Sequence, residues 1–367
     1  HSCVTLIEVT DRCNLTCPVC YASSAPDAGS HRSLEQIEFL LDCAVKSEGE
    51  PDVVQISGGE PTIHPEFFAI LEAAQRRPIK HLMVNTNGVR IAESEEFVRR
   101  LASYRPGFEI YLQFDSLQKE PIESLRGGDL REVRRRALER LNEHNVSTTL
   151  VVTLKKGRND GEIGEIIEFA LSQPCVRGVT FQPIQAAGRL QGFDPARDRL
   201  TLGEVRQQIV RQTDLFQAED VVPVPCHPDC IAMAYALKRN GTVLPLTRLV
   251  DPQALLEDAR NTIIYEKTAR LFSSGHSPDS SADSLRQLLC CLPQVEAPGS
   301  LGYENVFRVL IVQFLDAYNF DVRSVKKTCV HIVHPDGRII PFDTFNLFHR
   351  DPEQVARLER LRALEVR

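Results

Sequence analysis

Three cysteines, Cys13, Cys17 and Cys20, stand at C-x3-C-x2-C spacing directly after a run typical of a β-strand. Three thiolates on one tight loop can bind a metal cluster. A four-iron cluster takes four ligands, so this loop leaves one iron open to a ligand that is not protein. A closed zinc site would need a fourth ligand nearby, and no further Cys or His follows within the loop. The spacing therefore favours a catalytic cluster over structural zinc.

A second motif, Ser57-Gly58-Gly59-Glu60-Pro61-Thr62, follows an apolar run and precedes a helical pattern. Its two glycines let a backbone approach a ligand closely. Alone, it would be an ordinary strand-to-helix turn. Because it lies one βα unit after the cysteine loop, the two motifs together predict a cofactor site.

Apolar, β-rich runs alternate with helix-period segments through the first part of the chain. The predicted strands are 4–10, 52–57, 79–86, 108–114, 147–154 and 177–183, and the predicted helices are 34–48, 65–76, 93–104, 128–144 and 160–172. Six such repeats with right-handed crossovers predict an α/β fold, a partial (β/α)6 TIM-like barrel of parallel strands, over residues 1–190. Residues 191–367 form a predicted cysteine-containing C-terminal extension.

Polar residues follow the predicted strands at their carboxyl ends, where function collects in barrels of this kind. The candidate cofactor-binding residues at these ends are Asn87, Gln113, Asp115, Thr153 and Gln182. For two of these the ordinary alternative is structural: Asn87 with Gly88 could simply form a turn, and Asp115 could be a helix N-cap.

The cysteine loop and the G-G-E-P turn resemble those of the radical S-adenosylmethionine (SAM) superfamily, over residues 4 to about 190. The resemblance implies that Cys13, Cys17 and Cys20 ligate a 4Fe-4S cluster and that SAM chelates the fourth iron, with the G-G-E-P turn binding its amino group. One-electron cleavage of SAM would then give a 5'-deoxyadenosyl radical that abstracts hydrogen from substrate. A flavodoxin or ferredoxin is the expected electron donor.

Further cofactor contacts are implied by the same resemblance. Tyr21 follows the third cysteine, where the superfamily commonly places an aromatic residue against adenine. Gln113 and Asp115 are candidates for the ribose hydroxyls. Arg189, just past the sixth strand, is a candidate partner for a carboxylate, and a surface ion pair is its ordinary alternative.

Cysteines return in the C-terminal third at positions that match no zinc-finger spacing. Four thiolates gathered by folding suit an auxiliary 4Fe-4S cluster. The predicted ligands are Cys226, Cys230, Cys291 and Cys329, with Cys290 an alternative to its neighbour and scattered buried thiols the ordinary interpretation. Cys3 is a further candidate metal ligand. Because the chain begins at His1 rather than Met, we expect a leader segment before it.

Residues 331–346 predict a hairpin with Pro335-Asp336-Gly337 at its turn. It would bring polar groups beside Cys329, which makes His331 and Asp343 candidate catalytic residues. A structural role is the ordinary alternative for each.

The composition of the chain excludes some classes of protein. The net charge of −7 argues against general attraction to nucleic acid, and no run approaches the length of a membrane-spanning helix. Eleven cysteines in a chain without a signal peptide favour metal ligands and a reducing cytoplasm. The composition does not exclude binding to a membrane surface.

Over nearly its full length the chain resembles the branch that contains archaeal tetraether lipid synthase and the radical SAM methylases of methanopterin biosynthesis. The segments that carry this likeness are E-V-T-D-R-C-N-L-x-C-P-V-C-Y, C-H-P-D-C, L-L-C-C-L-P and C-V-H-I-V-H-P-D-G-R-I-I-P-F-D-T-F-N. We predict carbon–carbon bond formation at an unactivated sp3 carbon of a lipid chain. A methylase acting on a pterin-like or other small molecule, and a peptide-modifying enzyme, are the alternatives.

Overall fold

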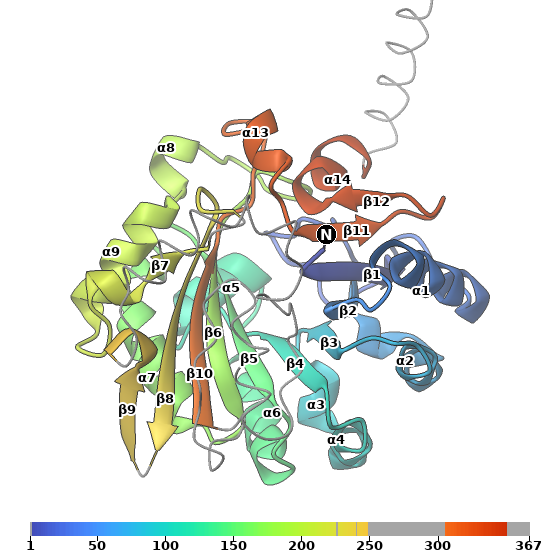
Figure 1. The fold of residues 1–367 in the computed structure, drawn as a ribbon, viewed down its shortest axis with the longest axis horizontal. Coiled ribbons are helices and arrows are strands. Elements are labelled where there is room, and N and C mark those ends of the chain that lie inside the picture. Colours follow the sequence, from blue (N-terminus) through green and yellow to red (C-terminus); the bar gives the residue numbers. More distant parts are fainter. Residues whose placement is uncertain (1, 225–226, 240, 249–304, 351–367) are drawn as a thin grey trace, which may run out of the picture.

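The computed structural model describes residues 2–224, 227–239, 241–248 and 305–350 (Figure 1). Its first six strands lie within two residues of the predicted bounds. They are β1 (Val4–Thr10), β2 (Val53–Gly58), β3 (His81–Thr86), β4 (Phe108–Gln113), β5 (Thr148–Leu154) and β6 (Val176–Pro183). The predicted Cys226, Cys290 and Cys291 lie outside the described residues.

The predicted helices are also present, on the outer face of the sheet (Figure 1). They are α1 (Leu34–Glu48), α2 (Phe67–Gln75), α4 (Glu95–Ala102), α6 (Arg131–Glu143) and α7 (Ile163–Ser172). A capping box at Ser33 and Gln36 starts α1, which then buries Ile37, Leu40 and Leu41. Two short helices that the sequence pattern missed are α3 (Val89–Glu93) and α5 (Lys119–Arg126).

The C-terminal third adds strands to both ends of the same sheet. The strand order in the described residues is β12-β11-β1-β2-β3-β4-β5-β6-β10-β8-β7, with β9 paired to β8. Strand β11 (Val330–Val333) is parallel to β1, and β10 (Val306–Val312) is parallel to β6. The sheet therefore has eight consecutive parallel strands rather than six, and it is curved but not closed. This confirms the predicted partial barrel.

The remaining strands pair antiparallel at the sheet edges. They are β7 (Val222–Pro223), β8 (Ile231–Arg239), β9 (Thr242–Pro245) and β12 (Ile339–Pro341). The β11–β12 pair confirms the predicted hairpin. The other helices are α8 (Pro195–Asp198), α9 (Leu202–Gln212), α13 (Val322–Val325) and α14 (Phe342–Phe348).

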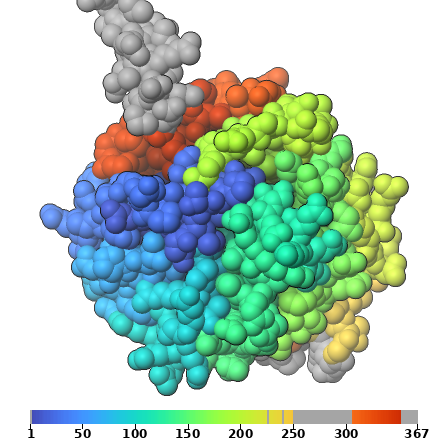
Figure 2. All heavy atoms as spheres, turned by 180° about the vertical axis from the view of Figure 1, so that it is seen from behind, coloured from blue at the N-terminus to red at the C-terminus, as the bar shows by residue number. Residues whose placement is uncertain are grey.

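The N-terminal and C-terminal segments meet beside the carboxyl end of β1. Figure 2 shows the blue cysteine segment next to the orange-red C-terminal segment and the yellow-green segment that follows β6. A bridge between Cys20 and Arg189 and the β1–β11 pairing account for this contact. Among the described helices, none has the length and apolar character needed to cross a bilayer.

A buried layer of charged and polar side chains lies inside the barrel. Glu109 on β4 interacts with His81 Nε2 at 3.2 Å, and Arg308 on β10 and Thr149 on β5 also donate to its carboxylate. Burial by itself raises the pKa of Glu109, but Arg308 and His81 outweigh it and lower the pKa. The layer joins four parallel strands, β3, β4, β5 and β10, and pairs its charges internally.

The end of β2 makes direct main-chain contact with the start of the cysteine loop. Gly59 N–H donates to Thr10 O at 2.7 Å, and Glu60 N–H donates to Arg12 O at 2.8 Å. A Cβ atom on Gly59 would collide with the Arg12 carbonyl oxygen. The glycines of the motif therefore make room for the cysteine loop itself, and not only for a ligand.

Replacing Gly59 by Ala should force these two backbones apart. We expect Gly59→Ala to lower the free energy of unfolding by about 1–3 kcal/mol, as overpacking does, and to lower iron uptake on anaerobic reconstitution. Thermal unfolding and iron analysis measure the two effects. Gly128→Ala is the matched control, because a Cβ there meets nothing within 4 Å. Equal iron content in both variants would contradict the proposed constraint.

Candidate active site

The three cysteines of the loop lie on the wall of the main cavity, at the carboxyl ends of the strands. Cys13 and Cys17 are buried, Cys20 is half-buried, and none forms a disulfide. Burial, with Glu60 and the other two cysteines adding to it, raises the pKa of Cys13 to about 12, and burial also raises the pKa of Cys17. Cys13 and Cys17 thus resist ionisation in the absence of metal, and a bound cluster would take them as thiolates.

Glu60 connects the G-G-E-P turn to the end of β3. Its carboxylate accepts hydrogen bonds from the Thr62 hydroxyl at 2.6 Å, the Thr86 hydroxyl at 2.7 Å and the Asn87 N–H at 2.7 Å. Burial raises the pKa of Glu60, while these bonds oppose the rise. Asn87 in turn donates to Asn14 Oδ1 on the cysteine loop at 2.6 Å. Gly58, Gly59, Glu60 and Asn87 thus form one continuous wall beside the cysteines.

Asp115 does not line the cavity, contrary to the role predicted for it. Its buried carboxylate pairs with Arg126, with Nε and Nη2 each 2.6 Å from one oxygen. Although burial alone would raise the pKa of Asp115, the paired guanidinium lowers it. Arg126 Nη2 also donates to Gln113 Oε1 at 3.1 Å and Thr153 Oγ1 at 3.0 Å. Asp115 therefore orients Arg126, which the sequence analysis missed and which does line the cavity.

Arg189 binds the cysteine loop instead of a carboxylate. Its Nε donates to Cys17 O at 2.6 Å and its Nη2 donates to Ser24 O at 2.7 Å. Main-chain hydrogen bonds in both directions also join Arg189 to Cys20. The loop after β6 therefore holds the cysteine loop from the side opposite Gly59.

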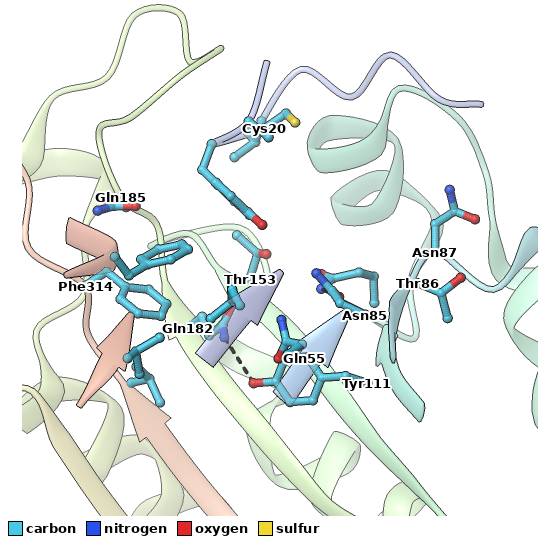
Figure 3. Close-up of a pocket in the computed structure, with 18 of the residues that line it drawn as sticks. Cys20, Gln55, Asn85, Thr86, Asn87, Tyr111, Thr153, Gln182, Gln185 and Phe314 are labelled. Carbon is cyan, nitrogen blue, oxygen red and sulfur yellow. Dashed lines mark hydrogen bonds between the residues drawn. The ribbon is translucent and has the colours of Figure 1, made fainter. Parts of the chain in front are cut away.

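A layer of uncharged polar side chains lies inside the barrel beside and below these residues (Figure 3). Gln113 Nε2 donates to Asn85 Oδ1 at 2.7 Å, and Gln182 Nε2 donates to Tyr111 Oη at 3.1 Å. Gln55 on β2 points into the same space. Alternation along the strands could have found Tyr111 and Gln55, since each lies an even number of residues before an inward-facing position.

The opposite wall of the cavity is apolar. It is built by β8, β10 and the residues that follow β10, together with the first residue of α14 and the start of β1. Its side chains are Leu6, Ile231, Met233, Leu310, Val312, Phe314 and Phe342. Tyr21 belongs to this wall, since its ring meets Phe342 edge-on with centroids 5.1 Å apart.

Two of the predicted auxiliary ligands lie together. Cys230 and Cys329 belong to one small buried apolar cluster, and Cys3 packs against it. Cys3 and Cys329 also line the cavity. Within the described ranges, no three His, Cys, Asp or Glu side chains are arranged to hold a single metal ion. Cys226 and Cys291 lie outside those ranges.

The two predicted catalytic residues of the hairpin do not line the cavity. His331 Nδ1 lies 2.9 Å from the Ser2 hydroxyl. Asp343 is buried at the start of α14 and accepts a hydrogen bond from Leu315 N–H at 2.7 Å. Burial raises the pKa of Asp343 to about 7, and nearby Asp316 adds to the rise. Asp343 thus holds the loop that follows β10.

This pKa predicts a pH-dependent stability. The folded state keeps the Asp343 proton from pH 3.8 to about 7, where the unfolded state has lost it, so this contribution is full at low pH and is lost as pH rises through 7. Each pKa unit is worth about 1.4 kcal/mol. Asp343→Asn keeps the acceptor for Leu315 and should unfold at a higher temperature than the parent at pH 8. A variant that is less stable at pH 8 would contradict this assignment.

Parts of the chain are similar to known proteins. Residues 7–170 match the family model for the radical SAM superfamily. The chain is 28% identical, over 94% of its length and 76% of the relative's, to 7,8-dihydro-6-hydroxymethylpterin dimethyltransferase of Methanocaldococcus jannaschii. It is 32% identical to GTP 3',8-cyclase of Syntrophomonas wolfei over 48% of this chain, and it spans about half (55%) of that relative.

Among solved structures, Streptococcus suis SuiB is similar with a TM-score of 0.48 and 19% identity, over 58% of this chain and 46% of that chain. A second SuiB structure, with S-adenosylmethionine bound, has the same score. The cysteine loop and the G-G-E-P turn both fall inside the matched residues 7–170. Residues 7–170 therefore form a radical SAM domain, and the similarity to a pterin dimethyltransferase extends beyond that domain.

Proposed function

We propose that this enzyme forms a carbon–carbon bond at an unactivated carbon of a pterin-like small molecule. The similarity to 7,8-dihydro-6-hydroxymethylpterin dimethyltransferase carries the proposal, because it extends over 94% of this chain and so includes the C-terminal third. The uncharged polar layer inside the barrel supports it, since amides and a phenol suit a neutral heteroaromatic ring. This substrate replaces the lipid chain as our first choice.

Cys13, Cys17 and Cys20 would hold the 4Fe-4S cluster, and SAM would lie against Gly58, Gly59, Glu60 and Asn87. Cluster and SAM together supply, when bound, a carbon radical strong enough to abstract hydrogen. The chain itself positions and shields the reactants. Glu60 and Asn87 fix the wall beside the cysteines, and Arg126 presents a guanidinium held by Asp115. The apolar wall excludes water, which protects a reactive intermediate.

A lipid chain is the second candidate, and the apolar wall favours it. Seven aliphatic or aromatic side chains face the cavity across from the polar layer, among them Met233, Leu310 and Phe314. Such a surface can bind an alkyl chain by burial alone. A lipid would leave the amides opposite without partners, which is costly. We therefore rank it second.

The substrate assignment can be tested by product analysis. Anaerobically reconstituted protein, given SAM, a reductant, a reduced folate that carries a one-carbon unit and 7,8-dihydro-6-hydroxymethylpterin, should give a pterin that has gained that carbon, together with 5'-deoxyadenosine, as measured by mass spectrometry. Cys17→Ala should abolish both products, because the cluster loses a ligand. Unchanged 5'-deoxyadenosine in that variant would refute the cluster assignment. Product from lipid extract but not from the pterin would favour the second candidate.

We also propose an auxiliary 4Fe-4S cluster at Cys230 and Cys329, with ligands from Cys226 and Cys291. The support is that Cys230 and Cys329, from segments about 100 residues apart, are buried together next to the cavity. Burial raises the pKa of Cys230 to about 12, with Asp343 and Asp229 adding to it. Cys3, packed against this pair, is an alternative ligand.

Iron content tests the auxiliary cluster. Reconstituted protein should bind about eight irons per chain, and Cys329→Ala should lower this to about four, because each cluster holds four. Cys175→Ala is the control, since that thiol is buried far along the sheet in the main apolar core. A parent iron content of about four, or no loss in Cys329→Ala, would exclude the auxiliary cluster.

A further inference from the structure

The Gln55 amide faces the cavity without a hydrogen-bond partner among the described residues. The Gln55 side chain is 7% exposed and lines the cavity, yet it forms no hydrogen bond with any described residue. Leaving a buried amide unpaired costs free energy, so an apolar residue would serve folding better at this position. Strand β2 therefore carries a polar group that folding does not use.

Gln55 lies below the proposed cofactor contacts. It is three residues before Gly58, which places it about 10 Å deeper along β2 than the strand end. The contacts proposed for SAM are all at strand ends. The amide of Gln55 is thus placed for a second ligand.

Two further groups face the same space. Tyr111 Oη accepts a hydrogen bond from Gln182 Nε2 at 3.1 Å, and the Thr180 side chain also interacts with this hydroxyl. Burial raises the pKa of Tyr111 to about 12, so its hydroxyl is protonated at neutral pH. The Gln182 carbonyl oxygen remains as an acceptor. Figure 3 shows Gln182 joined to Tyr111 by a hydrogen bond, with Gln55 among the residues that line the same cavity.

We infer that Gln55, Tyr111 and Gln182 form a subsite that recognises the edge of a planar, neutral ring bearing adjacent N–H and C=O groups. The inference rests on the proposed function and names the residues that select its substrate. Their donors and acceptors complement a cyclic amide such as the pyrimidinone half of a pterin. The three side chains are uncharged, and the Glu109–Arg308 pair below them is internally neutralised. Phosphate or carboxylate groups would find no counter-charge there.

Gln55→Met tests the subsite with two readouts. In full-length, reconstituted and SAM-loaded protein, the Kd for 7,8-dihydro-6-hydroxymethylpterin measured by calorimetry should rise about 10-fold, as the loss of a hydrogen bond in a dry site predicts. The melting temperature without pterin should stay equal or rise, because an unpaired buried amide is removed. A purely structural Gln55 would instead lose stability and keep its affinity.

Gln185→Met is the matched control. Gln185 lines the same cavity, but its Nε2 donates to Leu315 O at 2.6 Å, so this variant should melt at a lower temperature. An unchanged pterin Kd in Gln55→Met overturns the subsite while leaving the proposed function intact. Failure of the parent protein to bind pterin overturns both the substrate and the subsite. Tighter binding of a fatty alcohol by Gln55→Met, without pterin binding by the parent, would assign the cavity to lipid.

Discussion

The position of the cysteine loop depends on main-chain hydrogen bonds from two directions. The residues after β2 donate to Thr10 and Arg12, and Arg189 after β6 exchanges two main-chain hydrogen bonds with Cys20. Peptide groups have few orientations, so such contacts fix a loop more tightly than exposed side-chain pairs do. A cluster loop must hold three thiolates in one geometry. The barrel provides that geometry by bringing strands one, two and six to the same edge.

The buried carboxylates around the cavity are stabilised by ion pairs or by hydrogen bonds. Asp115 pairs with Arg126 through two hydrogen bonds, Glu60 is surrounded by donors, and Glu109 pairs with Arg308. A buried carboxylate without such partners would be costly. Asp343 accepts a hydrogen bond from Leu315 N–H, and burial raises its pKa to about 7, so at neutral pH it is charged only in part. The interior can therefore be polar without a strong net field at the reacting centre.

Local periodicity predicted the elements of the first 190 residues, because buried parallel strands are short apolar runs between longer helical patterns. It could not predict that β10 and β11 extend the sheet, since parallel pairing across 130 residues for β10 and 326 residues for β11 leaves no local signal. The cysteine loop could be recognised in the sequence because its three cysteines lie close together along the chain. Arg126 was not, because its role arises only when α5 places it over Asp115 and Thr153.

The proposed reaction class gives a reason for the cavity to have both a polar layer and an apolar wall. A radical formed on an unactivated carbon reacts with whatever is nearest, so selectivity requires that one carbon be held close and that water be absent. Gln55, Tyr111 and Gln182 can fix a ring by its polar edge, whereas apolar contacts with Leu310 and Phe314 fix no particular orientation. Under the proposed function, the polar layer would set which carbon is presented, and the apolar wall would enclose it. A cavity built only for alkyl chains would need the second face and not the first.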